Sequence, residues 1–366
     1  MGGERQAGGP DEMSGASRVN ADVAVPAARR AALLRLPAYA LALALLGAVL
    51  VAAFAFGKFP VAPGDLLRSV AARLGGGDAG LPPAVETVIW NIRLPRIAAG
   101  MLVGAALAAA GAAYQGMFRN PLVSPDILGV SSGAGFGATV GIYLGWPLAA
   151  VQGAAFLCGL AAVGAVYAIS GLVRRHDPVL VLVLAGVAVS TLLGAGISLF
   201  KIMADPYTQL TAIVFWLLGS LNGINALDLA SAAPLVGLGL APMLLLRWRV
   251  NLLSLSDEEA AALGVDVVRL RLVLIAAATL ATAAVVSIAG VIGWVGLVVP
   301  HAARFLVGPD FSRLLPAALL LGAGFVVGAD TLARTMAGIE LPLGIVTALI
   351  GAPFFLYLLA RSGRAE

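Results

Sequence analysis

Apolar residues occur along this chain in long runs that charged residues rarely interrupt. A membrane-spanning helix needs about 20 mostly apolar residues, and the runs reach this length repeatedly. The pattern predicts an all-α polytopic membrane protein with ten transmembrane helices. The expected spans lie at 36–57, 97–118, two within 127–173 on either side of a turn at 145–147, 178–200, 226–246, 272–290, a short broken one at 294–308, 313–333 and 341–360.

Two stretches differ from these spans. Residues 1–35 are rich in Gly, Ala, Ser and Arg without sustained periodicity, which predicts a disordered cytoplasmic tail before a transmembrane domain at 36–361. Residues 206–227 are free of charge but contain Thr, Gln, Ser and Asn. That mixture favours a short interfacial helix over a lipid-facing span.

Composition excludes several other classes of protein. The 366 residues are 60% hydrophobic and 11% charged, whereas soluble domains carry about 25% charged residues. The single cysteine, Cys158, excludes an internal disulfide and a multi-cysteine metal site. Neither Lys58 nor Lys201 stands in the Gly-Lys-Ser/Thr context of a phosphate-binding loop. We therefore expect no cofactor, no metal and no ATPase or other enzyme site in this chain.

The distribution of arginine sets the expected orientation. Cytoplasmic loops of membrane proteins are enriched in Lys and Arg, and placing both termini in the cytoplasm puts most arginines there. The net charge of +4 then reflects topology, so no nucleic-acid partner is expected. The arginines assigned to the inner side are Arg29, Arg30, Arg35, Arg119, Arg174, Arg175, Arg247, Arg249, Arg269, Arg271, Arg313, Arg361 and Arg364.

A weak internal repeat supports this topology. Displacing the chain by 175 residues places Arg96 on Arg271 and Pro125 on Pro300, with Ala and Leu matches between them. The second and seventh spans would run in opposite directions, so the halves would form an inverted repeat of the kind found in transporters. Chance matching of Ala and Leu is the alternative.

Charged residues also gather at the expected outer face. The segment RLPRIAAG begins with Arg93 and Arg96 at the mouth of the second span, where the positive-inside rule does not favour cations. Asp330, Arg334 and Glu340 cluster at the outer end of the ninth span, where mutual pairing is expected. Arg93 and Arg96 could bind carboxylates of a partner; alternatively, they snorkel or pair with Glu86 of the same chain.

The segment NLLSLSDEEAAALGVD, residues 251–266, predicts a surface helix on the inner side at about 254–264. Ser256 and Glu259 have the spacing of a capping box, and Gly264 can end the helix in a left-handed conformation. Leu253, Leu255 and Leu263 are expected as apolar anchors for a partner. The alternative is a helix that simply rests on lipid headgroups.

Two other segments stand out, one that turns the chain at the inner face and one inside or near a span. Residues 115–135 form a Pro- and Gly-broken loop that is longer than a turn requires. Residues 290–310 contain His301 and Arg304, and no carboxylate is paired with them in the sequence. A lone histidine on an apolar helix is more often a packed residue than a ligand, so a structural role is expected for His301.

These motifs resemble a known family. RLPR, GAALAAAG, YQGMFRNPLVSPDILGVSSGAG, FWLLGSL, LLSLSDEEAAALGV, IAGVIGWVGLVVPHAARFLVG and ELPLGIVTALIGAPFFLYLL occur in the order found in the ten-span permeases of bacterial ABC importers for iron–siderophore complexes, haem and cobalamin. The resemblance runs from about residue 93 to the C-terminus. It implies a permease without an ATPase site of its own.

The resemblance also implies partners and site residues. A homodimer would enclose the path, two cytoplasmic subunits would bind ATP and Mg, and a periplasmic binding protein would dock on Arg93, Arg96 and Arg334. The cytoplasmic gate would comprise Asn120, Leu122, Val179 and Leu180, although the last two are apolar where some relatives have hydroxyl groups. The ATPase contact would comprise Leu255, Ser256, Asp257, Glu258, Glu259, Ala261, Leu263 and Gly264.

The expected function is import of an iron chelate, haem or a ferric siderophore, from the periplasm across the bacterial inner membrane. Cobalamin is the alternative cargo, because walls of Ala, Gly, Val and Leu do not identify a chelate. The alternative mechanism is an ion-coupled secondary transporter. Such proteins place ionisable residues within spans, and most spans of this chain lack them.

Overall fold

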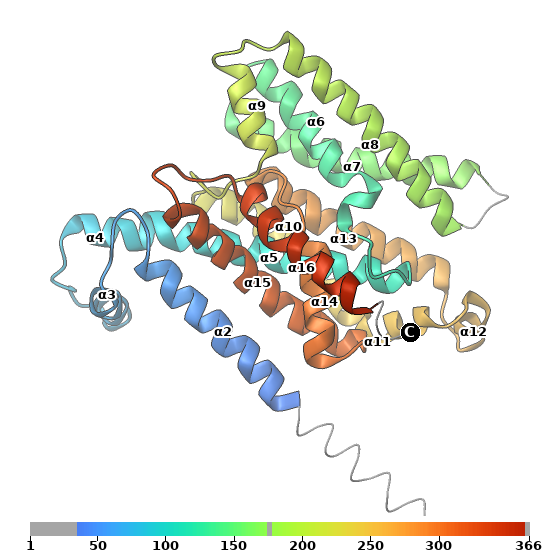
Figure 1. The fold of residues 1–366 in the computed structure, drawn as a ribbon, viewed down its shortest axis with the longest axis horizontal. Helices are drawn as coiled ribbons and strands as arrows, with labels where there is room; N and C mark the ends of the chain where they lie inside the picture. Colours follow the sequence, from blue (N-terminus) through green and yellow to red (C-terminus); the bar gives the residue numbers. More distant parts are fainter. Residues whose placement is uncertain (1–34, 174–177, 363–366) are drawn as a thin grey trace, which may run out of the picture.

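The computed structural model describes residues 35–173 and 178–362, and every regular element in these ranges is a helix (Figure 1). The predicted tail at 1–35 lies outside the described residues except for Arg35, which begins α2. Arg174, Arg175 and Arg364 also lie outside them.

Each of the ten predicted spans coincides with a helix. Seven helical segments in the described ranges are long and apolar enough to cross a membrane. They comprise α2 (Arg35–Ala55), the continuous segment Pro83–Met117 that ends in α5 (Leu94–Met117), α7 (Leu148–Leu172), α8 (Pro178–Met203), α10 (Ala226–Leu245), α13 (Val267–Ala289) and α15 (Phe311–Thr335). The polytopic all-α fold is therefore confirmed.

The other three predicted spans coincide with shorter helices. These are α6 (Val130–Tyr143, 14 residues), α14 (Val295–Val307, 13 residues) and α16 (Leu343–Ser362), whose apolar part is Leu343–Tyr357. Helix lengths thus support seven spans and leave the count of ten as a prediction. Helices α6 and α14 are each the third span of a predicted half and both are short, which agrees with the predicted repeat.

Glycines end the helices where the sequence pattern predicted breaks. Gly145 has a φ of +70° between α6 and α7. Gly290 has a φ of +69° and follows α13, so the long apolar run divides there into α13 and α14. The predicted interfacial segment contains α9 (Gln209–Leu217). Glycine enters this left-handed region without a steric penalty, and its positions fix the turns.

The sequence pattern did not predict the helices between the first two spans. These are α3 (Pro63–Gly75), α4 (Pro83–Thr87) and the π-helix η1 (Val88–Arg93), which continues into α5. A signal for α3 was present, because Pro63 stands in its first turn and Gly76 ends it with a φ of +70°. Proline at the start and glycine just after the end are the usual limits of a helix.

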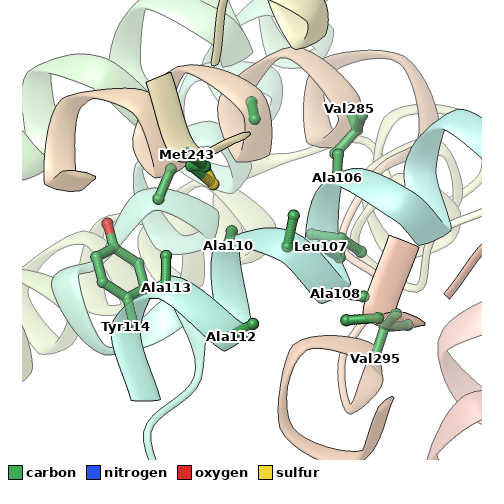
Figure 2. Close-up of a cluster of buried hydrophobic side chains, with 14 of the residues drawn as sticks. Ala106, Leu107, Ala108, Ala110, Ala112, Ala113, Tyr114, Met243, Val285 and Val295 are labelled. Atoms are coloured by element: carbon green, nitrogen blue, oxygen red, sulfur yellow. The ribbon is translucent and has the colours of Figure 1, made fainter. Parts of the chain in front are cut away.

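Helix α5 forms the centre of the bundle and packs against α10, α13, α14 and α15. Its buried side chains are mostly alanine, and Figure 2 shows them facing Met243 of α10, Val285 of α13 and Val295 of α14. A Cβ on Gly104 would overlap the carbonyl oxygen of Gly322 in α15. Small residues therefore let the helix backbones approach closely, as is usual in membrane bundles.

Charged and capped residues gather at two opposite ends of the bundle. We call one the α12 end; it holds α11 (Arg247–Val250), η3 (Asn251–Ser254) and α12 (Asp257–Ala262). The other is the α4 end, where α2 finishes and α5 is entered from α4 and η1. Figure 1 shows α4 and α12 far apart along the longest axis.

Candidate functional site

Helix α12 begins and ends as its sequence predicts. The backbone N–H of Glu259 donates to Ser256 Oγ at 3.2 Å, and the backbone N–H of Ser256 donates to Glu259 Oε2 at 2.9 Å. Gly264 follows the helix with a φ of +83°. The capping box and the left-handed glycine are therefore confirmed, although the α-helix is only Asp257–Ala262. The preceding residues form the 3-10 helix η3.

The apolar residues around α12 divide into two groups. Leu255 and Leu263 are 36% and 62% exposed, so they remain available to a partner. Leu253 is fully buried, and the expectation that it would serve as an exposed anchor is wrong. It lies in η3 and packs into the main core with Ala260 of α12. Leu253 and Ala260 therefore seat the α12 segment on the bundle.

Asp257, the first residue of α12, lies between two arginines. Arg271 donates from Nη1 and Nη2 to the two carboxylate oxygens at 2.7 and 2.8 Å. Arg119 donates from Nη2 to Asp257 Oδ1 at 2.8 Å and from Nε to the carbonyl oxygen of Leu253 at 2.6 Å. Hydrogen bonds from Arg271 and the charges of both arginines hold the pKa of the Asp257 carboxyl below its usual value.

These contacts join three parts of the chain at the α12 end. Arg119 follows the last turn of α5, and Arg271 lies in the first turns of α13. The end of α5 therefore meets the start of α13, so these two helices run in opposite directions, as the predicted inverted repeat requires. We call Arg119, Asp257 and Arg271 the α12 clamp.

The α12 clamp adjoins the loop that contains the predicted gate residues Asn120 and Leu122, which we call the gate loop. Arg119 has a φ of +51°, a conformation that is uncommon for residues other than glycine. Asn120 follows, and its Oδ1 accepts a hydrogen bond from the backbone N–H of Leu122 at 2.9 Å. The hydrogen bond from Arg119 to Asp257 therefore fixes the position of Arg119, the residue between α5 and the gate loop.

The predicted gate residues lie at this same end of the molecule. Leu122 and Leu180 are 52% and 50% exposed. Val179 lines a cavity of about 380 Å³ together with Arg119, Asp257 and Arg271. The structure therefore brings Val179 beside the α12 clamp, and it leaves Leu122 and Leu180 on the surface of the single chain.

Sequence reasoning missed the role of Arg119 and Arg271. Both arginines served only to fix the expected topology, because nothing in a linear sequence says which arginine faces a given carboxylate. Their partner Asp257 was identified as part of the predicted helix at 254–264. The usable signal was that both arginines stand at the inner ends of predicted spans, on the same side as this helix.

A second charge cluster lies at the α4 end. Arg96 donates to Asp330 at 2.9 to 3.1 Å and to Glu340 at 3.2 to 3.4 Å. Arg334 forms an ion pair with Asp330 at 3.2 Å. We call Arg96, Asp330, Arg334 and Glu340 the buried cluster. Asp330 and Arg334 pair with each other as predicted, whereas Glu340 pairs with Arg96, which lies at the centre of the cluster.

Arg93 and Arg334 also hold the end of α2. Arg93 donates to the carbonyl oxygens of Phe54 and Phe59. Arg334 donates to the carbonyl oxygens of Ala53 at 3.0 Å and Phe56 at 3.4 Å. The last carbonyl groups of a helix lack partners within it and carry partial negative charge, so cations stabilise this end.

The three predicted docking arginines are therefore buried and bonded within the chain. Their exposed fractions are 4% for Arg93, 8% for Arg96 and 7% for Arg334. Compensation by a partner's carboxylate was expected, but Asp330 and Glu340 of the same chain already compensate Arg96. Glu86, the acid suggested as an internal partner, accepts a hydrogen bond from Ser69 Oγ at 2.7 Å instead. Docking at these arginines stays a prediction.

His301 and Arg304 lie on one helix near the α12 end. The His301 ring meets the Phe305 ring edge-on with 5.3 Å between their centroids. This contact agrees with the packed role expected for His301. In residues 35–173 and 178–362, no three His, Cys, Asp or Glu side chains gather as metal ligands.

Comparison with known proteins agrees with this architecture. The model of the FecCD transport family matches residues 43–361. The chain is 48% identical over 281 residues to the cobalamin import system permease protein BtuC of Halobacterium salinarum, covering 76% of this chain and 75% of that protein. It is 43% identical over 279 residues to an iron chelatin transport system permease protein of Helicobacter pylori, covering 76% and 84%.

A solved structure extends the similarity to three dimensions. The inward-facing conformation of a metal-chelate type ABC transporter superimposes with a TM-score of 0.78 at 37% identity, covering 87% of this chain and 97% of that one. Other relatives are named for further cargoes, molybdate among them. The family model and the helical bundle agree over most of the chain, which therefore belongs to the FecCD transport family and is a multi-pass permease subunit of an ABC importer.

Proposed function

We propose that this permease moves an iron chelate, haem or a ferric siderophore, from the periplasm to the cytoplasm across the bacterial inner membrane. Two partner ATPase subunits at the α12 end bind ATP and Mg, and this chain binds no cofactor itself. Both termini and α12 lie in the cytoplasm. The observation that carries the proposal is the α12 clamp, which ties an exposed surface helix to the first residue of the gate loop.

The distribution of arginine supports this orientation. Arg119, Arg271 and Arg313 lie at the α12 end, as do the arginines of α11. At the opposite end, Arg93, Arg96 and Arg334 are buried and bonded within the chain, while Lys58, Arg68 and Arg73 are exposed. Exposure alone therefore does not decide the orientation, and the cytoplasmic assignment of the α12 end rests on the positive-inside rule applied to the whole sequence.

The position of the gate residues supports a homodimer. Leu122 and Leu180 expose about half of their surface in the single chain. Side chains on an outer surface close a path only when another surface faces them. Helix α8, whose first turn contains Leu180, exposes an apolar stripe that includes Leu184, Val187 and Leu199. A second copy of the chain facing this stripe would bring the two sets of gate residues together around one path.

The ATPase contact is assigned to the surface around α12. Its short helix packs on the bundle through Leu253 and Ala260, so a displacement of α12 would also move residues of the core. Leu255, Glu258, Ala261 and Leu263 remain exposed for the partner. Asp257 passes the displacement to Arg119 and thus to the gate loop. This arrangement suits a helix that transmits force, whereas a helix resting on lipid would not need the clamp.

The periplasmic binding protein is assigned to the α4 end. Glu340 is the most accessible member of the buried cluster, with 26% of its side chain exposed. A carboxylate of the binding protein could replace Glu340 on Arg96, since both would offer the same hydrogen-bond acceptors. The docking role of Arg93, Arg96 and Arg334 would then require this exchange of partners.

The cargo is proposed from the comparisons. A relative named for iron chelatin and a solved transporter of the metal-chelate type support an iron chelate. Cobalamin is the second candidate, because the relative that is 48% identical is named for cobalamin import. Uptake into proteoliposomes that contain the permease, its ATPase and its binding protein would compare haem, a ferric siderophore and cobalamin. Uptake of cobalamin alone would contradict the iron-chelate proposal.

The ATPase contact is tested by Leu263→Glu. Leu263 is 62% exposed, so a charge there costs the fold little but disrupts an apolar contact with a partner. We expect loss of co-purified ATPase and of transport, with unchanged membrane insertion. The matched control is Leu74→Glu at the α4 end, where Leu74 is 85% exposed in α3. Equal ATPase recovery from the two variants would contradict the assignment of α12.

A further inference from the structure

A cavity of about 280 Å³ opens at the α12 end, beside the gate loop. It lies between the end of α5, the η3 segment and the junction of α14 with α15. Its polar lining residues are Gln115, Arg119, Asn120, Asn251, Ser254 and Arg304. The predicted functions of the gate and of α12 do not explain this set of amides and arginines.

Arg304 brings a positive charge to this cavity without a counter-charge. Its side chain makes no hydrogen bond and no ion pair within residues 35–173 and 178–362. Nη1 is enclosed by the protein, so an acceptor from another molecule would bind at Nε or Nη2. A guanidinium stays protonated in proteins. A buried charged nitrogen without an acceptor is costly, so this position calls for an acceptor from another molecule.

The neighbouring groups offer further donors. Arg119 uses Nε and Nη2 for Leu253 and Asp257, and its Nη1 makes no hydrogen bond in the described part of the chain. Asn120 uses Oδ1 to accept from Leu122, which leaves its amide N–H groups to donate. Three side chains, Arg304, Arg119 and Asn120, therefore present unused donors to one cavity.

Acceptors around the cavity are few. Gln115 is 98% buried, and its Oε1 has no donor among the described residues. Asn251 is fully used, because Nδ2 donates to Asp310 and Ser312 and Oδ1 accepts from Phe311. The Ser254 hydroxyl donates to the Asn251 carbonyl oxygen and can still accept. Donors with positive charge thus predominate over acceptors.

The nearby carboxylates do not neutralise Arg304. Asp257 is shared between Arg119 and Arg271. Asp310 accepts from Asn251 at 2.8 Å and pairs with Arg313 at 3.5 Å. The region therefore retains excess positive charge. Arginine binds tetrahedral oxyanions through paired hydrogen bonds.

We propose that this cavity binds a phosphate group, held by Arg304 with Arg119 and Asn120 as further donors. Two sources carry this chemistry, free inorganic phosphate and the headgroup of a phospholipid. Because Arg304 belongs to α14 and Asn120 to the gate loop, a bound phosphate would tie the loop to α14. The site would thus stabilise one position of the gate loop.

The test is a titration of the purified full-length chain with inorganic phosphate in a neutral detergent at constant ionic strength. Binding is measured by calorimetry. If free phosphate is the source, we expect saturable binding that Arg304→Gln weakens at least about tenfold, because a hydrogen bond to a charged group is lost. Arg249→Gln is the matched control, since Arg249 is exposed at the same end. Arg304→Lys should retain part of the affinity.

A second measurement separates binding from a purely structural role. Without phosphate, Arg304→Gln should melt at the same temperature as the wild type or higher, because it removes an uncompensated buried charge. A marked fall in melting temperature without phosphate would show that Arg304 already has a partner, and it would overturn the proposal.

The two sources are distinguished by lipid. Phosphatidylglycerol and the phosphate-free digalactosyldiacylglycerol are added separately to the detergent-solubilised chain. A rise in melting temperature with phosphatidylglycerol only, absent in Arg304→Gln, indicates a headgroup; binding of inorganic phosphate without this rise indicates the free ion. If neither phosphate nor phosphatidylglycerol distinguishes the wild type from Arg304→Gln, the site is wrong. The ATPase plays no part, so failure here leaves the proposed function intact.

Discussion

The α12 clamp and the buried cluster place the same chemistry in opposite surroundings. In each, one aspartate lies between two arginines, although Arg334 is only four residues from Asp330 on α15. The side chain of Asp330 is 2% exposed, whereas that of Asp257 is 51% exposed. The difference in burial sets what each cluster can do.

A buried ion pair resists separation, and we call such a pair a fixed joint. When one partner of a buried pair is removed, the other charge stays without compensation and without water. In an exposed pair, water replaces the missing partner, so opening costs little. The buried cluster therefore fixes α2, α5 and α15 at the α4 end. The α12 clamp can open and close at small cost, as transmission to a gate requires.

Asp330→Ala should have the largest effect on stability. It leaves Arg96 and Arg334 with less negative charge nearby, and loss of one partner of a buried pair costs about 3–5 kcal/mol. We expect a large drop in the melting temperature of the purified protein. Asp78→Ala is the control at the same end, because Asp78 is exposed and accepts only from the Gly80 backbone N–H.

A double variant sharpens this prediction. Asp330→Leu with Arg96→Met removes both charges and fills similar volume, which often restores stability. We expect it to recover part of the loss seen with Asp330→Ala. If Asp330→Ala melts within experimental error of the Asp78→Ala control, then the buried cluster is not a fixed joint and the contrast with the α12 clamp fails.

Much of the fold follows from local rules that act within one segment. Apolar length predicts the helices, and glycine or proline predicts their ends, as at Gly145 and Gly290. The capping box at Ser256 and Glu259 is equally local, since its two residues are three positions apart. Helix α3 escaped because a short amphipathic helix gives no membrane-length signal, although Pro63 and Gly76 limit it.

The candidate site depends on contacts between residues far apart in the sequence, and the sequence alone does not say which of these residues pair. Arg96 and Asp330 are 234 positions apart, and Arg119 and Asp257 are 138 apart. Charge and position predicted that such residues lie at particular faces, but pairing depends on how α5 packs against α13 and α15. The burial of Leu253 was not predicted for the same reason, because the packing of η3 against the bundle decides which leucine faces the core.

Asp257→Asn should change stability little and function strongly. The exposed clamp is worth about 1 kcal/mol or less, so the melting temperature should fall by only a few degrees. Transport in the reconstituted complex should fall severalfold while ATPase association persists, because the link from α12 to Arg119 is weakened. Asp78→Asn is the control, since Asp78 is an exposed aspartate outside the α12 surface and accepts a hydrogen bond from the Gly80 backbone N–H.

The opposite pattern would contradict the contrast between the clusters. If Asp257→Asn destabilises the protein as much as Asp330→Ala, the α12 clamp is also a fixed joint. If transport by Asp257→Asn equals that by the Asp78→Asn control, the clamp does not transmit motion to the gate loop. In that case the Leu263→Glu experiment still tests ATPase docking independently.

The smallest expected effect is the pH dependence of the α12 clamp. Its arginines lower the pKa of Asp257 in the folded chain, so the clamp stabilises the fold only while this carboxylate is ionised. The contribution is present above the pKa of an unfolded aspartate, about 3.9, and is lost as pH falls through the lower folded value. The difference in melting temperature between the wild type and Asp257→Asn should therefore stay constant from pH 7 to about 4.5 and shrink below about pH 4. Taking this difference cancels the titration of distant acids. A difference that grows on acidification would show that the Asp257 carboxylate is unfavourable in the fold, against its position between two arginines.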